Sequence, residues 1–401
     1  LMFIDLDQFK LINDSCGHEA GDHLLIDIAS RLVEVVRPGD TVARFGGDEF
    51  IILCDQISEE DDLKHLIERI IENVKQPVDI DGSVFYPTVS IGIAGGNGNE
   101  VTGEQLLQNA DTAMYIAKEQ GRDGWKIYDN EIGENTRLHV RIASGLRKAV
   151  ENNELEAYYQ PIVDTNTLEI IGSEALLRWN HEGEMISPAQ FIPVAEMTGS
   201  IVELGFWVFE EACRQQAILR NYFTDEEMPY ISVNLSARQL VQHNLIERFE
   251  EIIKKYNAST RHLVIEVTES TLMINIDRSL ELLQKMGEIG LSLAIDDFGT
   301  GHSSLSRIKS LPVDTIKIDQ TFVRNVNHDT GNQAIIRAVV NMAHAMELKV
   351  TAEGVEEIGE LNILREMKCN RVQGYLFDRP LNAEQFLNVL LKYRCGYKLA
   401  V

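Results

Sequence analysis

The alternation of short apolar runs with helical patterns in the second half of the chain constrains its fold most strongly. Eight such runs read as buried strands, and most are separated by segments with helical periodicity. Eight strands with intervening helices over about 250 residues are typical of a (β/α)8 barrel of the TIM type. The predicted strands are Leu155–Val163, Leu168–Leu177, Tyr230–Leu235, Leu263–Thr268, Leu291–Asp296, Thr315–Asp319, Lys349–Glu353 and Val372–Phe377.

The first two of these runs are joined too closely for a helix to fit between them. A parallel pair needs a crossover connection, so this pair is predicted to be antiparallel. The fold class expected for the second half is therefore a barrel with one antiparallel strand, covering residues 153–401. A helix over residues 131–152 is predicted to connect it to the first half.

The first half, residues 1–130, shows a different pattern of short strands and helices. The glycines of Gly46–Glu49 have the spacing of a hairpin turn between two strands. We therefore expect an α/β domain with a mostly antiparallel sheet. Strands are predicted at Leu1–Leu6, Thr41–Phe45, Phe50–Leu53, Val84–Ala94 and Trp125–Tyr128, and helices at Gly21–Val36, Asp61–Lys75 and Thr102–Gln120.

The charge balance limits the ligands that this chain can attract. The formal net charge is −26, which repels nucleic acid polymers and anionic membranes. An anionic ligand must therefore be held locally, by metal ions, helix N-termini or single basic side chains. The five cysteines are scattered and never spaced as C-x-x-C, which favours a reducing, cytoplasmic location over disulfides or a zinc site.

The chain starts inside an apolar run, Leu1–Ile4, without an initiator Met. We therefore expect it to be part of a longer protein whose upstream sensory domains, and any membrane anchor, lie outside this sequence. No run here reaches the roughly 20 apolar residues of a membrane span.

The ends of the predicted barrel strands carry an unusual number of polar groups. In such barrels the C-terminal strand ends meet at one rim, where active sites form. Several carboxylates at one rim need cations, and oxygen ligands of this kind suit a pair of Mg²⁺ or Mn²⁺ ions. The strand-end residues are Glu174, Asn234, Glu266, Asp296, Asp297, Lys317, Asp319, Glu353 and Gln373.

Two interpretations of this acidic rim remain open. A two-metal clamp stabilises the attacking and leaving oxygens in phosphoester cleavage, so the rim predicts a phosphoester hydrolase. The alternative is that the acids pair with lysines and arginines around the barrel mouth and hold no metal.

The motifs at these positions resemble, in order, those of EAL-domain phosphodiesterases of cyclic di-GMP. The resemblance implies a (β/α)8 barrel that cuts one phosphodiester of cyclic di-GMP to give linear pGpG. The matching segments are Tyr159–Pro161 (YQP), Glu174–Arg178 (EALLR), Asn234–Ser236 (NLS), Glu266–Glu269 (EVTE), Asp296–Gly301 (DDFGTG), Lys317–Asp319 (KID), Ala352–Glu356 (AEGVE) and Gln373–Tyr375 (QGY).

This resemblance also assigns roles by motif position. Lys317 would orient or deprotonate the attacking water, and Glu269 would anchor the loop Phe298–Ser304 beside the metals. Metal ligation is assigned to Glu174, Asn234, Glu266, Asp296 and Glu353, with Asp297 and Asp319 in or beside the shell of the second ion. Contacts to the dinucleotide are assigned to Gln160, Arg178 and Gln373.

The first half carries a second resemblance. Gly46–Phe50 (GGDEF) resembles the signature of diguanylate cyclases, and Asp5–Lys10, Ile12–Asp14, Gly17–Asp22 and Ala117–Arg122 resemble the accompanying segments. The family joins two GTP molecules between two such domains, with Mg²⁺. Its helical segment before the strand of Asp5 has no counterpart here, because the chain starts at Leu1.

The cyclase resemblance assigns its own set of residues. Asp5, Asp48 and Glu49 would serve the metal and catalysis, and Asn13 and Asp22 the guanine edge. Phosphate contacts are assigned to Lys10, Lys118 and Arg122, and the R-x-x-D product-inhibition site to Arg37 and Asp40.

The sequence thus predicts a tandem GGDEF-EAL protein whose main activity is hydrolysis of cyclic di-GMP. The expected partners are cyclic di-GMP, GTP and a second copy of the chain in a homodimer. Two alternatives remain: both halves are active enzymes, or one or both sites bind nucleotide as receptor modules without turning it over.

Overall fold

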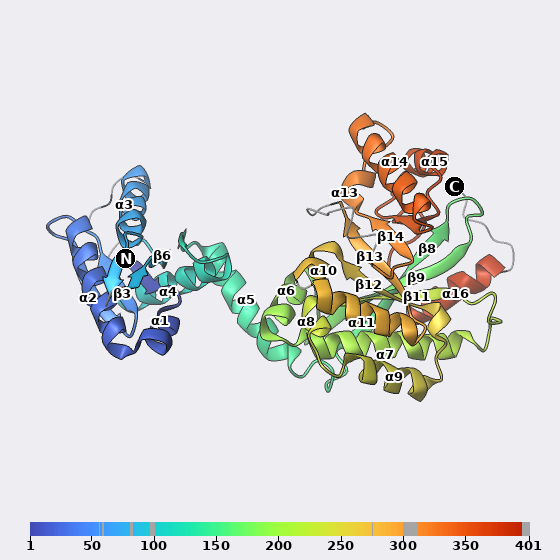
Figure 1. Cartoon of the computed structure of the whole chain (residues 1–401), viewed down its shortest axis with the longest axis horizontal. Helices are drawn as coiled ribbons and strands as arrows, with labels where there is room; N and C mark the ends of the chain where they lie inside the picture. The colour runs from blue at the N-terminus through green and yellow to red at the C-terminus, as the bar shows by residue number, and fades with distance from the viewer. Residues whose placement is uncertain are drawn as a thin grey trace. The chain divides into compact units, whose positions relative to one another are not determined.

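The computed structural model describes residues 1–55, 57, 60–80, 83–96, 101–274, 276–299 and 311–394. The chain forms two compact units, Leu1–Arg141 and Ile142–Val401 (Figure 1). The division falls inside helix α5, Asn130–Leu146, so one helix contributes to both units.

Unit 1 contains a five-stranded sheet with the order β2-β3-β1-β6-β7. All neighbouring strands are antiparallel except β6 and β7, which confirms the mostly antiparallel sheet. The strands are β1 Met2–Leu6, β2 Thr41–Gly46, β3 Glu49–Leu53, β6 Val89–Ile93 and β7 Gly124–Ile127, and a separate hairpin contains β4 Val78–Ile80 and β5 Ser83–Phe85. The helices are α1 Phe9–Cys16, α2 His18–Val35, α3 Glu60–Val74 and α4 Gly103–Glu119.

Two details of unit 1 differ from the prediction. The run Val84–Ala94 is divided between β5 and β6, and Pro87 lies in the interruption. Proline has no amide hydrogen for a ladder bond, so it interrupts the strand pairing there. Helix α1 was not predicted, because its eight residues are too few to show a clear helical repeat.

Unit 2 is a closed barrel. The parallel strands follow the order β9-β11-β12-β13-β14-β15-β16, and β8 closes the ring by pairing antiparallel with both β16 and β9. This confirms the predicted barrel with one antiparallel strand. The strands are β8 Leu155–Asp164, β9 Ile170–His181, β11 Tyr230–Asn234, β12 Leu263–Thr268, β13 Ser292–Phe298, β14 Thr315–Ile318, β15 Lys349–Ala352 and β16 Arg371–Gln373, with the short β10 Glu184–Ile186 and β17 Leu381–Asn382 at the edges.

Helices surround this barrel (Figure 1). On its outside, α9 packs against both α7 and α11. None of the helices in the described part of the chain is both long and apolar enough to cross a membrane. The helices are α6 Pro188–Thr198, α7 Ile201–Leu219, α8 Ala237–Leu240, α9 Leu245–Tyr256, α10 Glu269–Ile274, α11 Ile276–Glu288, α13 Gln320–Val323, α14 Thr330–Ala345, α15 Ile358–Glu366 and α16 Ala383–Arg394, with a 3-10 turn η1 Thr260–His262.

The last barrel strand is shorter than the predicted Val372–Phe377. A Cβ atom at Gly374 would lie 2.1 Å from the carbonyl oxygen of Val355, so the chain leaves the strand in a close approach that only glycine permits. This contact places Gln373 directly beside the segment that follows β15.

Strand register sets which side chains enter the barrel. Residues in register on parallel neighbours point to the same face, and Glu174 is in register with Ser232, while Asn234 is in register with Glu266. Thr268, on the same strand as Glu266, is in register with Asp296 on the following strand, β13. The polar residues of successive strands therefore gather inside the C-terminal mouth of the barrel.

Close packing of α4 on β6 gives a test of the fold of unit 1. A Cβ atom at Gly92 would lie 1.9 Å from the carbonyl oxygen of Ala110 and 2.1 Å from the amide nitrogen of Met114. Gly92→Ala must therefore push α4 off the sheet, and we expect it to lower the free energy of unfolding by about 1–3 kcal/mol in denaturant titrations.

The matched control is Gly103→Ala at the start of α4, where nothing lies within 4 Å of the added atom. This control should not destabilise the protein, because alanine favours helix over glycine. Equal effects of the two substitutions would contradict the packing seen at Gly92.

Candidate active site

The centre of the barrel mouth is the ammonium group of Lys317, whose side chain is 2 % exposed. Its Nζ lies 2.6 Å from Glu266 Oε2 and 2.6 Å from Glu353 Oε1. Asp296 Oδ1 lies at 3.3 Å and Glu174 Oε2 at 3.5 Å. Four carboxylates from four different strand ends thus surround one buried cation.

This cluster has more negative than positive charge, and the pKa values show the consequence. Burial raises the pKa of Glu266 to about 8 against the lowering effect of Lys317, and the charges of Glu174 and Asp296 add to the rise. Burial also raises the pKa of Glu353 well above its usual range. Burial alone would lower the pKa of Lys317, but the carboxylates hold it well above its ordinary value. Without metal ions, protons must therefore supply part of the missing positive charge.

Glu174 is held in place by two amide side chains. Asn234 Nδ2 donates to its Oε1 at 2.7 Å, and Gln373 Nε2 donates to its Oε2 at 2.7 Å. Burial acts to raise the pKa of Glu174, but the charge of Lys317 and these hydrogen bonds keep it below its ordinary value. Glu174 therefore remains ionised.

Gln373 also links the two sides of the barrel seam, because its Nε2 donates to Gln160 Oε1 at 3.2 Å. Its own Oε1 is buried and finds no hydrogen-bond partner among the described residues. A buried acceptor without a partner is costly, so this oxygen is available for a donor on a bound ligand.

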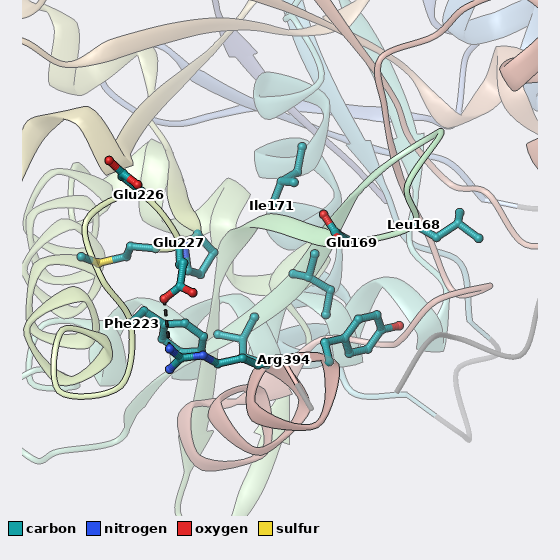
Figure 2. Close-up of a pocket in the computed structure, with 12 residues that line it drawn as sticks. Leu168, Glu169, Ile171, Phe223, Glu226, Glu227 and Arg394 are labelled. Atoms are coloured by element: carbon teal, nitrogen blue, oxygen red, sulfur yellow. Dashed lines mark hydrogen bonds and ion pairs between the residues drawn. The ribbon is translucent and has the colours of Figure 1, made fainter. Parts of the chain in front are cut away.

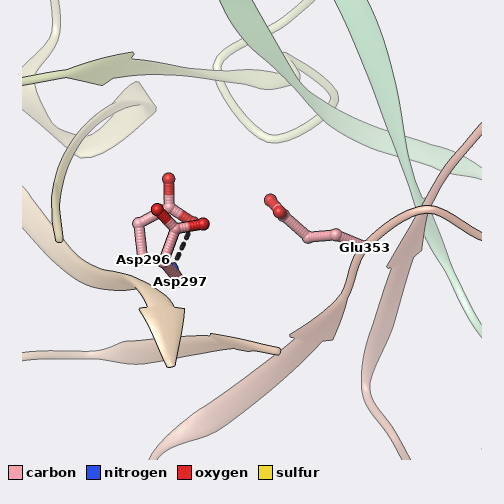
Figure 3. A group of neighbouring side chains, drawn as sticks. All are labelled: Asp296, Asp297 and Glu353. Atoms are coloured by element: carbon pink, nitrogen blue, oxygen red, sulfur yellow. Dashed lines mark hydrogen bonds between the residues drawn. The ribbon is translucent and has the colours of Figure 1, made fainter. Parts of the chain in front are cut away.

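Asp296, Asp297 and Glu353 form a group in which one oxygen of each lies within 4.8 Å of the others. Figure 3 shows the two aspartates side by side, with the Glu353 carboxylate facing them. The backbone of Asp297 has a left-handed φ of 53°, and its amide donates to Asp296 Oδ1 at 3.0 Å. Burial, followed by the charge of Asp296, raises the pKa of Asp297. Oxygen donors with excess negative charge fit Mg²⁺ or Mn²⁺.

Asp319 lies close enough to Asp297 for its charge to raise the pKa of that residue. It also caps helix α13, because its Oδ1 accepts from the amide of Thr321 at 2.9 Å. One carboxylate oxygen of Asp319 is therefore committed to the helix end.

Glu269 contacts the start of the loop that it is predicted to anchor. Its Oε2 accepts from the amide of Gly299 at 3.3 Å. The rest of the predicted loop Phe298–Ser304, from residue 300 on, lies outside the described residues.

A cavity of about 320 Å³ adjoins the acidic centre, near the lower end of the size range of ligand pockets. Its walls are mostly apolar side chains, with Arg178 and Asn234 at the side of the centre. The Arg178 guanidinium lies 5.4 Å from the ring centroid of Tyr158. Sequence reasoning missed Tyr158, although it precedes the Tyr159–Pro161 motif directly.

The predicted metal residues of unit 1 also meet in space. Asp5 is paired across the sheet with Glu49, and the amide of Leu6 donates to the Asp48 carbonyl at 3.3 Å. Burial raises the pKa of both Asp5 and Glu49, and the charge of Asp48 adds to the rise in each. Lys118, a predicted phosphate contact, forms an ion pair with Asp5 at 2.7 Å.

The predicted guanine residues lie on consecutive helices, Asn13 on α1 and Asp22 near the start of α2. A Cβ atom at Gly21 would lie 2.0 Å from Asn13 Oδ1, so the amide of Asn13 rests against the backbone next to Asp22. Asp22 lines a cavity of about 460 Å³ whose floor includes Leu25 and Phe50.

Three further predicted residues of unit 1 lie at the surface. Lys10 and Arg122 are exposed. Arg37 Nε lies 3.6 Å from Asp40 Oδ2, and both residues line a cavity of about 260 Å³ together with Arg69.

A larger cavity, of about 620 Å³, lies at the opposite, N-terminal end of the barrel strands (Figure 2). It is formed by the residues before β9 and β11 and by the end of α16, and Arg394 pairs there with Glu227 at 3.1 Å. None of the predicted site residues lines it. Active sites of such barrels form at the C-terminal strand ends, so this cavity is not the candidate active site although it is larger.

The fold and the rim together define a class: a (β/α)8-barrel enzyme with an acidic centre at its C-terminal rim, joined to an α/β domain with its own acidic cluster. Residues 143–380 match the EAL domain, and residues 1–124 match the diguanylate cyclase, GGDEF domain. The chain belongs to the family of tandem GGDEF-EAL proteins.

Two similar proteins have names that refer to cyclic di-GMP. The bifunctional diguanylate cyclase/cyclic di-GMP phosphodiesterase MucR of Pseudomonas aeruginosa is 41% identical over 389 residues, covering 96% of this chain and 56% of that protein. The cyclic di-GMP phosphodiesterase PdeR of Escherichia coli is 36% identical over 387 residues, covering 96% of this chain and 58% of that protein. The chain thus spans little more than half the length of these curated relatives.

A solved structure resembles unit 2. The PaMucR phosphodiesterase in complex with c-di-GMP shares 40% sequence identity, with a TM-score of 0.59, and covers 61% of this chain and 99% of that chain.

The charge imbalance predicts a strong effect of removing the central ammonium. Lys317→Met leaves buried carboxylates without their cation, so in a chelator the free energy of unfolding should fall by about 3–5 kcal/mol, measured by denaturant titration. The control is Lys285→Met, which breaks an exposed pair with Glu281 and should cost less than about 1 kcal/mol. A loss no larger than that of the control would contradict a net negative centre.

Proposed function

We propose that unit 2 hydrolyses one phosphodiester of cyclic di-GMP to give linear pGpG, with divalent cations as cofactors. The observation that carries this proposal is the excess of buried carboxylates around Lys317 at the rim of the barrel. The relatives named as cyclic di-GMP phosphodiesterases support the choice of substrate.

The donor set suits two cations. The residues that would hold them are Glu174, Asn234, Glu266, Asp296 and Glu353, with Asp297 and Asp319 beside the second. Divalent ions bound there would supply Lewis-acid stabilisation of the scissile phosphate and lower the pKa of water.

Lys317 and Glu353 are the two groups at the centre that are best placed to contact the attacking water. The carboxylates hold the pKa of Lys317 well above its ordinary value, and its ammonium is placed to donate a hydrogen bond that orients the attacking water. Glu353 touches this ammonium and is 18 % exposed, more than the other three carboxylates. As the most exposed of the four, Glu353 is the carboxylate best placed to hold an ion next to the attacking water at the open side of the site.

The residues proposed to contact the substrate are on β8, β9 and β16, where the barrel closes. Gln373 offers its unpartnered Oε1, which suits an N–H or O–H donor of the dinucleotide, and Gln160 lies beside it. Arg178 is positioned to bind a phosphate oxygen, because its planar guanidinium can donate two parallel hydrogen bonds.

Isosteric removal of a carboxylate tests this site. Glu353→Gln should lower kcat for pGpG formation by roughly 10²–10³-fold, the size expected for losing one preorganised electrostatic contact. Glu174→Ala and a chelator should also abolish most of the activity. Product formation would be followed by chromatography with Mg²⁺ or Mn²⁺ present.

Glu366→Gln is the matched control, because Glu366 is exposed on α15 and far from the described contacts of the centre. It should retain wild-type turnover. Undiminished turnover in Glu353→Gln would reject the proposed site.

We further propose that unit 1 binds GTP with Mg²⁺ in the cavity beside Asp22. The close approach of Asn13 to Gly21 supports this, because it places an amide and a carboxylate together, as recognition of a guanine edge requires. Asp5, Asp48 and Glu49 would hold the metal. Cyclase activity would need a second copy of the domain that presents its own GTP.

GTP binding is expected to alter hydrolysis by unit 2, since helix α5 belongs to both units. Typical couplings of about 1–3 kcal/mol correspond to roughly 5- to 150-fold changes. Asp22→Ala should remove the effect of GTP on cyclic di-GMP hydrolysis, whereas Asp14→Ala, at an exposed position of α1, should keep it. Identical rates with and without saturating GTP would show that unit 1 does not regulate unit 2.

A further inference from the structure

Glu360 is a buried acid for which the reaction described above has no use. It lies in the first turn of α15 and is 3 % exposed. No lysine or arginine of the described residues forms an ion pair with it. Burying a carboxylate is costly unless hydrogen bonds satisfy it, so its contacts must explain its position.

Three backbone amides satisfy this carboxylate. Its Oε2 accepts from the amides of Glu356 at 2.8 Å and Glu357 at 3.1 Å, which belong to the segment between β15 and α15. Its Oε1 accepts from the amide of Asn325 at 2.8 Å, which follows α13. The first two bonds cap helix α15, but the third joins two different loops.

Each of these loops carries part of the proposed site. The chain that leads to Asn325 contains Lys317 and Asp319, and the chain that leads to Glu356 contains Glu353. Lys317 itself lies in β14, and the amide of Glu353 donates to the Ile318 carbonyl at 3.1 Å, so strand pairing sets this part of the backbone. The placement of the two loops then decides where Asp319 and the Glu353 side chain, 2.6 Å from Lys317 Nζ, lie. In Figure 1, α13 and α15 lie in the same part of unit 2, above the barrel strands.

The loops approach each other closely near the active site. A Cβ atom at Gly354 would lie 2.5 Å from Cβ of Gln320, and Gly354 has a left-handed φ of 71°. Two other polar contacts join the loops, Arg324 to Glu356 and Asn327 to Glu357, each at 3.4 Å and on the exposed side. Long, solvent-exposed contacts of this kind contribute little to holding the loops together. The buried carboxylate of Glu360 accepts shorter and stronger hydrogen bonds.

We propose that Glu360 is a positioning residue that fixes the loop that begins at Glu353 against the loop that follows β14 and begins at Asp319, and thereby sets the geometry of the metal and water side of the site. This inference rests on the proposed function for its kinetic consequences. Glu360 itself touches neither substrate nor metal.

The expected kinetic signature separates positioning from a general loss of structure. Gln160 and Arg178 lie on β8 and β9, which Glu360 does not contact, so KM for cyclic di-GMP should change by less than about twofold. Displacing reacting groups by about 1 Å can cost roughly 10²-fold, so Glu360→Met should lower kcat by roughly 10- to 100-fold.

Two conservative variants show which property matters. Glu360→Gln keeps the length but has only one acceptor oxygen, so it can accept either from the amide of Asn325 or from those of Glu356 and Glu357, and its NH2 group faces the other donors. It should therefore lower kcat by an amount between wild type and Glu360→Met. Glu360→Asp keeps the charge but is too short to reach both loops, so it should behave like Glu360→Met. Glu360→Asp carries the test if the methionine variant does not fold.

Gln216 provides the matched control. It is fully buried on α7, and its side chain bonds the backbone of Ser259 through Nε2 at 2.9 Å and Oε1 at 2.5 Å. Gln216→Met therefore removes a similar buried contact to a loop, at the opposite end of the barrel strands. It should lower the melting temperature about as much as Glu360→Met does, while kcat stays within about twofold of wild type.

The decisive experiment measures kcat, KM and, by calorimetry, Mn²⁺ affinity for wild type and these variants. Glu360→Met should weaken Mn²⁺ binding roughly tenfold while Gln216→Met leaves it unchanged, since losing an orienting contact typically costs 10- to 100-fold in metal affinity. Equal kcat losses in Glu360→Met and Gln216→Met, or a kcat and Mn²⁺ affinity unchanged in Glu360→Met, would overturn the proposal. If wild type does not hydrolyse cyclic di-GMP, the proposed function fails, and the Mn²⁺ affinities alone decide the role of Glu360.

Discussion

The unbalanced charge around Lys317 is the constraint on which unit 2 depends. Four carboxylates share one ammonium in the closed mouth of the barrel, and the only ways to relieve the repulsion are protons or bound cations. A structural role would be served equally well by apolar side chains. The cluster therefore fits the proposed role as a site for divalent ions better than a purely structural role.

The barrel makes this concentration of charge possible. Parallel strands in register place Glu174, Glu266 and Asp296 on one inner surface, and each strand is braced by its neighbours. The amide side chains of Asn234 and Gln373 then use their hydrogens to hold Glu174 ionised. The same geometry leaves the side-chain oxygen of Gln373 without a hydrogen-bond partner among the described residues.

The sequence predicted the barrel and its acidic rim because buried parallel strands are nearly continuous apolar runs and their polar ends stand out. It did not predict α1, which is too short for a periodic signal, or the interruption of the strand at Pro87. Tyr158 was missed because an aromatic residue in a strand usually belongs to the core. Glu360 was missed because its bond to Asn325 joins segments 35 residues apart, and nothing in the local pattern distinguishes it from a surface acid.

The antiparallel strand β8 has a consequence for the order of events during synthesis. It lies between β9 and β16, so the first strand of unit 2 closes the ring only against the last, and the hydrogen bond from Gln373 to Gln160 crosses that seam. Gln373 must emerge from the ribosome before its side-chain amide can donate a hydrogen bond to Glu174. Nascent chains that already contain every proposed metal ligand would therefore still have an open barrel, and the site would be complete only after β16 has emerged from the ribosome.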